Sequence, residues 1–186
     1  MPIKSTEIGS IEKLQKDFLC RIPAIRELNY WEQLERIKML SLQRRLERYR
    51  IIYIWKTLEG LAPNCGIQSS SEEGRLGRKC IVPIINTKAR QSVQSKKEQT
   101  FQVNGPQLFN SLPIELRNIK NCALEDFKYK LDQWLERVPD EPNVRGLTPG
   151  GMDANARASN SIVHQAKRIH MGPNQMATTH DHMIIV

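Results

Sequence analysis

Apolar residues recur at helical spacing near the start of the chain. In residues 8–20 they lie three or four positions apart, with Glu, Lys and Gln between them: Ile8, Ile11, Leu14 and Phe18. This pattern predicts an amphipathic helix. The helix should end before Pro23, because the residue that precedes a proline is disfavoured in the helical region.

Two capping signals follow. Asn29 with Glu32 three residues later has the pattern of a capping box, and Leu34 and Ile37 are expected to form the buried face of the short helix that it starts. Ser41 offers a second N-cap. We therefore expect a third and longer helix to begin directly after Ser41.

The stretch 42–59 is predicted to be this longer helix, with one face formed by Leu42, Leu46, Tyr49, Tyr53 and Lys56. Its first half is basic and carries Glu47 as its only acid. Its second half, residues 51–55, is apolar nearly all round, which indicates enclosure by protein. Gly60 is expected at the C-terminal cap, and Pro63 prevents continuation.

Residues 61–78 are rich in Gly, Ser, Asn and Pro, which is typical of a loop. Two short stretches after it have a β-like pattern, namely 80–85, which Pro83 interrupts, and 100–103. Pro83 favours an edge strand or an irregular extended segment. Gly105-Pro106 is then expected to start a helical turn with proline at its first position.

Residues 121–138 give the clearest helical pattern. Asn121 is the expected N-cap, Pro139 stops the helix, and one face is apolar: Leu124, Phe127, Leu131, Trp134, Leu135 and Val138. This face should belong to the core and contact the 42–59 helix. Beyond 139 no apolar periodicity remains, so residues 139–186 are predicted to be a disordered tail. The expected fold is mainly α, a small helical domain over residues 1–138 with one short extended or β element.

Positive charge is concentrated in this domain. The net charge is +8, and the four acids and four bases of residues 139–186 cancel, so the excess lies in residues 1–138.

Two basic clusters contain many of these positive charges. The first comprises Arg44, Arg45, Arg48 and Arg50, and the second, which contains no acid, comprises Arg75, Arg78, Lys79, Lys88, Arg90, Lys96 and Lys97. Such clusters predict contact with the phosphates of RNA or DNA without reading of bases. The alternative is that Arg44 and Arg48 pair with Glu47 or nearby acids and that residues 75–97 are only a solvated loop.

Patterns of catalytic, metal and membrane chemistry are missing from the sequence. The four cysteines, Cys20, Cys65, Cys80 and Cys122, are scattered without metal-ligand spacing, which favours reduced thiols. All four histidines lie beyond residue 160, so a base for a Ser or Cys nucleophile is lacking in the domain. No apolar run is long enough for a membrane span, and no secretory leader is seen. We expect an intracellular protein, nuclear or cytoplasmic, with no enzymatic activity, cofactor, metal or small-molecule substrate.

Several segments, taken in order, resemble one family. They are residues 11–18, 28–34, 40–49, 54–63, 101–103, 105–113 and 124–132. Together they are similar to the region that follows the polymerase domain in jockey and CR1-type non-LTR retrotransposon polyproteins. Residues 138–148 and 160–162 resemble the element's terminal peptide, and the loss of resemblance after about Ala166 suggests read-through past an ancestral stop.

The departures from the family limit what the resemblance implies. A reverse transcriptase needs a metal-binding aspartate pair, and this sequence has no adjacent aspartates. The endonuclease domain and the Cys-Cys-His-Cys knuckle of related elements are also missing. The resemblance therefore implies a non-catalytic C-terminal fragment. The two basic clusters predict that this fragment binds RNA or DNA phosphates without sequence specificity. Two alternatives stay open. One is a module that packs on a reverse transcriptase thumb in trans, with Trp31, Trp55 and Trp134 as candidate contacts, and the other is an inert transposon remnant.

Overall fold

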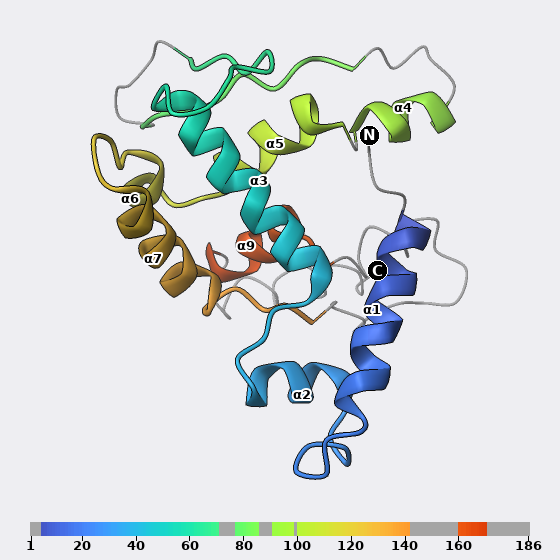
Figure 1. Ribbon diagram of the computed structural model, residues 1–186. Helices are drawn as coiled ribbons and strands as arrows, with labels where there is room; N and C mark the ends of the chain where they lie inside the picture. The colour runs from blue at the N-terminus through green and yellow to red at the C-terminus, as the bar shows by residue number, and fades with distance from the viewer. Residues whose placement is uncertain (1–4, 71–76, 86–90, 99, 142–159, 171–186) are drawn as a thin grey trace, which may run out of the picture.

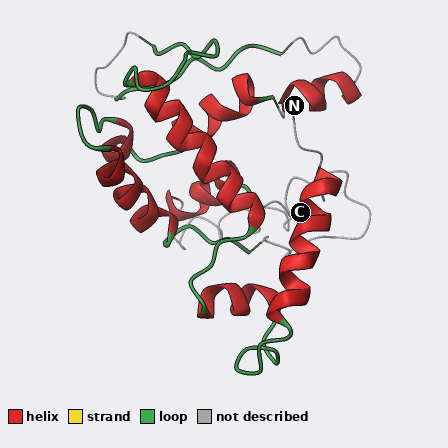
Figure 2. Cartoon of the chain, viewed as in Figure 1, coloured by secondary structure: helices red, strands yellow, loops and turns green. Residues whose placement is uncertain are grey.

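A computed structural model describes residues 5–70, 77–85, 91–98, 100–141 and 160–170 of the chain. The described residues form a mainly helical assembly (Figures 1 and 2), which confirms the predicted fold class. Its helices are α1 (Ser5–Leu19), α2 (Tyr30–Arg36), α3 (Leu42–Leu58), α4 (Gln91–Glu98), α5 (Phe101–Asn110), α6 (Ile114–Arg117), α7 (Leu124–Leu135) and α9 (Ile162–His170).

Helix α3 crosses the centre of the molecule, with α5, α7 and α9 around it (Figure 1). The predicted caps are present, since Ser41 accepts from the Arg44 N–H and Gly60 adopts a φ of 73°. The N–H of Gly60 bonds to Thr57 and that of Leu61 to Lys56, which is a Schellman ending. The apolar half of α3 is enclosed as predicted, because Ile51, Ile52, Ile54 and Trp55 are buried.

The face of α3 that the spacing picked out is not the buried side of the helix. Tyr49 is exposed, and the buried stripe runs from Ile51 and Trp55 back through Glu47 to Arg44. Because these positions lie three or four apart, they share one side of the helix. The helix buries four of the five residues of its apolar half, while Tyr53 is half-buried. The buried side also places two charged residues, Arg44 and Glu47, in the interior.

Helix α7 bears out the predicted core face and its contact with α3. Phe127, Leu131, Leu135 and Val138 are buried, and Leu124 and Trp134 pack against the same core. The rings of Trp55 and Phe127 stack with centroids 4.6 Å apart and planes 8° from parallel. The predicted N-cap was wrong, because Ala123 holds that position and Asn121 has a φ of 51°.

Helix α5 corrects two predictions. Residues 101–103 belong to this helix and not to a strand, and Pro106 lies inside the helix instead of at its first position. Packing against α3 stabilises the helical conformation of residues 101–110. Gly105 has no side chain and so admits Ile54, whose Cδ1 would lie 3.0 Å from an added Cβ. The apolar alternation of Phe101 and Val103 was too short to distinguish helix from strand.

The one extended element in the described part of the chain is small. Ser69 and Cys80 form an isolated antiparallel bridge, and the N–H of Ile81 donates to Gln68. From there residues 81–85 run extended along α5 (Figure 1). The side chain of Asn110, at the end of α5, donates to the Cys80 carbonyl and accepts from the Cys80 N–H, both at 2.8 Å.

The N-terminal hairpin, residues 5–40, forms a second small core of Leu19, Ile25 and Leu34. The predicted capping box is present, since Asn29 accepts from the N–H of Glu32 and Glu32 accepts from that of Asn29. Ile37 is exposed instead of buried as predicted. The hairpin is therefore held by its own small core, and none of its residues belongs to the main core.

Part of the predicted tail belongs to the fold. Residues 142–159 and 171–186 lie outside the described residues, but 162–170 form helix α9. Ile162 and Ala166 are buried in the main core. For residues 160–166 the prediction of disorder is therefore wrong. Ile162, Val163, Ala166 and Ile169 lie at helical spacing, so the sequence did contain a signal for an amphipathic helix, which the prediction of disorder overlooked.

Candidate functional site

The first basic cluster is directed mainly into the protein. The guanidinium of Arg44 is wholly buried, donates to the carbonyls of Pro139 at 2.6 Å and Asn160 at 3.1 Å, and lies 3.5 Å from Asp140. Burial lowers the pKa of Arg44, and the charges of Asp140 and Glu47 act in the opposite direction. This side chain holds two C-terminal segments against α3 and cannot reach a phosphate.

A polar network surrounds Arg44. Asp140 accepts from the N–H and the hydroxyl of Ser41, both at 2.7 Å, while Glu47 accepts from the N–H of Ile162 at 2.7 Å. A buried carboxylate is costly unless donors surround it. These bonds join the start of α3 to residues about a hundred positions later in the sequence, and they fix the place of α9.

The other arginines of the first cluster also have protein partners. Arg48 makes a two-point ion pair with Asp132 of α7, with Nη2 to Oδ2 at 2.6 Å, and this hydrogen bonding raises the pKa of Arg48. Arg50 donates to the amide oxygen of Asn104 at 2.8 Å, and Arg45 donates to Gln15. The alternative of internal pairing is therefore the better interpretation of this cluster, although the main partner of Arg48 is on another helix.

The second cluster is divided. Arg78 is buried and pairs with Glu59, Nη1 to Oε1 at 2.7 Å, whereas Lys79 is half-buried. Lys96 and Lys97 are exposed in the last turn of α4. Arg75, Lys88 and Arg90 lie outside the described residues. Among the described bases of this cluster, Lys96 and Lys97 are the ones that face solvent fully.

Helix α1 presents an exposed apolar surface that the sequence pattern alone does not reveal. Its polar residues Glu12 and Gln15 face the protein, where Glu12 accepts from the N–H of Leu42 at 2.8 Å and caps α3. Tyr30 bonds to Glu12 and Gln15, and its pKa is raised by burial and by the Glu12 carboxylate. Burial of this polar side leaves much of the apolar side of α1 in solvent.

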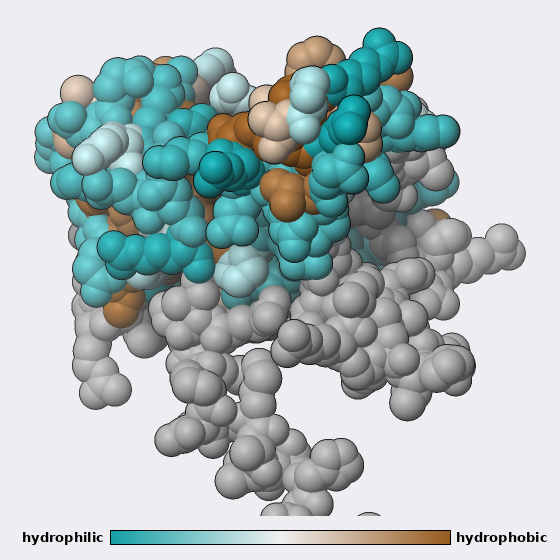
Figure 3. Space-filling model, turned by 90° about the horizontal axis from the view of Figure 1, so that it is seen from below, coloured by the Kyte–Doolittle hydropathy of each residue, from teal (hydrophilic) through white to brown (hydrophobic). Residues whose placement is uncertain are grey.

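The apolar surface of the N-terminal hairpin consists of six exposed side chains: Ile11, Leu14, Phe18, Leu28, Ile37 and Met39. Leu14 is 67% and Phe18 63% exposed. We call these six the hairpin surface. Viewed from the end where α2 and residues 20–29 lie, apolar surface forms a patch with hydrophilic residues around it (Figure 3). The helical spacing of Ile11, Leu14 and Phe18 was the available signal, but it does not tell which side of a helix is covered.

The three tryptophans do not form this surface. Trp55 is wholly buried, and its indole N–H donates to the Ile119 carbonyl at 3.0 Å. Trp31 and Trp134 are partly buried, each against a different core cluster. Trp55 therefore cannot contact a partner directly, whereas Trp31 and Trp134 stay partly accessible.

The four cysteines are free thiols, with Cys20 and Cys65 exposed and Cys80 buried. In the described ranges no group of three or more His, Cys, Asp or Glu side chains could hold a metal ion. No described helix has the length and apolar character needed to cross a bilayer.

Comparisons with protein-family models, curated proteins and solved structures gave no match.

Proposed function

We propose that the chain is a non-catalytic, intracellular module derived from the post-polymerase region of a jockey/CR1-type non-LTR retrotransposon, and that it binds protein through the hairpin surface. The partner is the polymerase domain of such an element, supplied in trans. The origin rests on the ordered sequence resemblance over residues 11–132, and the absence of catalysis rests on the missing aspartate pair.

The observation that carries protein binding is the concentration of six exposed apolar side chains within residues 11–39. Exposed apolar patches rimmed by polar residues are typical of interaction sites. Leu14 and Phe18 lie four positions apart on one helix, the spacing at which a partner can cover both at once. The arginines of the first cluster, by contrast, are already bonded within the chain.

Co-purification tests this proposal. The full chain and a tagged polymerase domain of a jockey-type element are mixed after nuclease treatment, and capture is measured for wild type and for L14D/F18D. We expect at least tenfold weaker capture of L14D/F18D. The matched control is I81D/Y129D, since Ile81 and Tyr129 are also exposed but lie elsewhere. Equal capture of wild type and L14D/F18D, or no capture at all, would contradict the proposal.

Phosphate binding by the second cluster is the second candidate, favoured by the exposure of Lys96 and Lys97. A filter-binding titration of the full chain with RNA and with duplex DNA at two salt concentrations tests it. K96A/K97A should weaken binding and reduce the salt slope by about one per lysine removed. The control K13A/K16A removes two exposed lysines of α1 and should reduce binding and the salt slope less.

Binding that is undetectable at low salt, or insensitive to salt, contradicts this candidate. Failure of both experiments leaves the third alternative, an inert remnant.

A further inference from the structure

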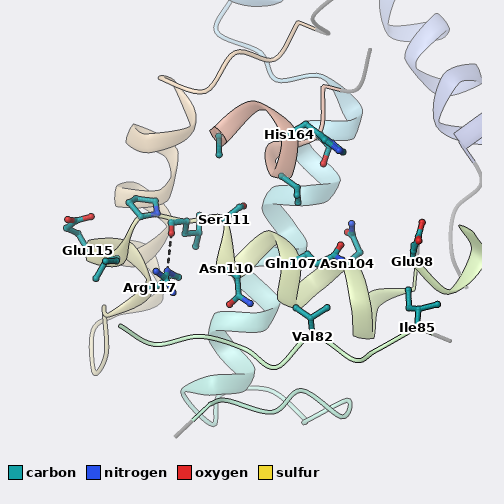
Figure 4. A pocket seen from close by; sticks show the side chains of 16 residues that line it. Val82, Ile85, Glu98, Asn104, Gln107, Asn110, Ser111, Glu115, Arg117 and His164 are labelled. Atoms are coloured by element: carbon teal, nitrogen blue, oxygen red, sulfur yellow. Dashed lines mark hydrogen bonds between the residues drawn. The ribbon is translucent and has the colours of Figure 1, made fainter. Parts of the chain in front are cut away.

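An open groove crosses α5 on a side of the molecule away from the hairpin surface. The cavity measures about 910 Å³. One wall is the extended segment with Val82 and Ile85, the other is α9 with Val163 and His164, and α5 forms the floor (Figure 4). We propose that this α5 groove binds an extended polypeptide, and that the Gln107 amide recognises the backbone of that polypeptide.

Helix α5 already binds an extended backbone in this way. The Asn110 amide bonds to both the N–H and the carbonyl of Cys80, each at 2.8 Å. A side-chain amide has donors and an acceptor in one plane, so it pairs with a peptide unit as another strand does. The contact is independent of which side chain the bound residue carries.

Gln107 lies one helical turn before Asn110 and also lines the groove (Figure 4). Its side chain is half-buried, and among the described residues its amide has no hydrogen-bond partner. A further turn back is Asn104, whose oxygen is taken by Arg50 and whose amino group remains a possible donor. Three amides at spacings of three thus follow one side of α5, and only the last is fully engaged.

The walls suit alternate side chains of an extended chain. Val82, Ile85, Val163 and Ala166 offer apolar contacts on two sides, while successive residues of a strand point in opposite directions. Ile84 is 99% exposed, and residues 82–85 make no backbone hydrogen bond with other described residues. An incoming strand could therefore pair with this segment as well as with Gln107.

The charges favour polypeptide over nucleic acid. Glu98 and Glu115 line the groove, and its arginine, Arg117, is buried and donates to the carbonyls of Leu112 and Arg78. Phosphates would meet two carboxylates without an available guanidinium. A polypeptide backbone carries no charge and meets no such repulsion.

Selection of peptides tests the inference. A display library of random ten-residue peptides is panned on the full chain, and the best synthetic peptide is titrated by fluorescence anisotropy. We expect Q107A to weaken binding at least fivefold, and the control Q102A, on an exposed position of the same helix, to leave it unchanged. Helical circular dichroism of each variant confirms that it folds.

N-methylation of the selected peptide, one backbone nitrogen at a time, separates backbone recognition from side-chain recognition. At least one N-methyl group should reduce affinity tenfold in wild type and much less in Q107A. The inference is overturned if no peptide is enriched, if Q107A binds as wild type, or if N-methylation has no effect. It is also overturned if single-stranded RNA binds with affinity sensitive to Q107A while peptides do not.

Discussion

The backbone N–H of Ile162 donates to the buried carboxylate of Glu47 over 2.7 Å, across 115 positions of sequence. Gln43 supplies a second donor to the same carboxylate. The start of α9 therefore satisfies a charge that α3 would otherwise bury without sufficient partners. Ile162 itself is fully buried against the core, so one residue provides both an apolar and a polar contact.

Removal of α9 should destabilise the protein. A chain that ends at Glu141 loses the burial of Ile162 and Ala166 and leaves Glu47 and Arg44 short of partners. We expect a loss of at least about 3 kcal/mol in the free energy of unfolding, measured by urea denaturation. A chain that ends at His170 keeps these contacts and is expected to match the full chain. Equal stability of all three would show that α9 is not part of the core.

Trp55 and Trp134 should differ in importance. Trp55 is wholly buried and stacks on Phe127, so Trp55→Ala should cost about 3–5 kcal/mol. Trp134 is partly exposed on α7, and Trp134→Ala should cost markedly less. Thermal unfolding followed by circular dichroism measures both. Similar losses for the two variants would be inconsistent with Trp55 as the centre of the core.

Gly77 and Gly66 provide a matched pair for backbone and packing effects. Both have positive φ, 65° and 83°, so an alanine is strained at either position. Only at Gly77 would a Cβ also meet a neighbour, Asn118 Oδ1 at 2.9 Å, which accepts from the N–H of Arg78. Gly77→Ala should therefore be more destabilising than Gly66→Ala in urea denaturation, by about 1–2 kcal/mol. The reverse order would contradict the close approach.

The Cys80 thiol should make stability fall at high pH. Burial raises the pKa of Cys80 from 9.0 to about 11, against the opposing effect of Arg78 and Arg117. Between these pH values the unfolded chain releases a proton that the folded chain keeps, so rising pH favours unfolding, by at most about 1.4 kcal/mol per pH unit. From pH 8 to 11 the urea midpoint should therefore fall more for the wild type than for Cys80→Ala, which lacks the thiol.

Alkylation at pH 8 should modify the exposed Cys20 and Cys65 long before the buried Cys80.

Local signals in the sequence were sufficient for much of the fold. Asn29, Ser41 and Gly60 act as the expected caps, because each uses only its near neighbours. The apolar face of α7 was also predictable, since its six residues share one period of 3.6. These features depend on interactions within about four positions.

The features that could not be predicted depend on distant residues. The sequence around Arg44 is that of a surface arginine. Its partners are distant in sequence, namely the carbonyls of Val138, Pro139 and Asn160 and the carboxylate of Asp140. The outward side of α1 follows from Glu12, which is held inward by Leu42 and Tyr30. The sequence therefore suggested a phosphate-binding helix at the place where the structure has an internal polar network.

The place of α9 in the core also affects how the protein is made. Ribosomes add about 5–20 residues per second, so Ile51 and Trp55 are synthesised roughly 5 to 20 s before Ile162, which completes the cluster around them. For that interval the nascent chain has an unfinished apolar core. Chaperones that bind exposed apolar segments would meet it then, and productive folding must follow the synthesis of α9.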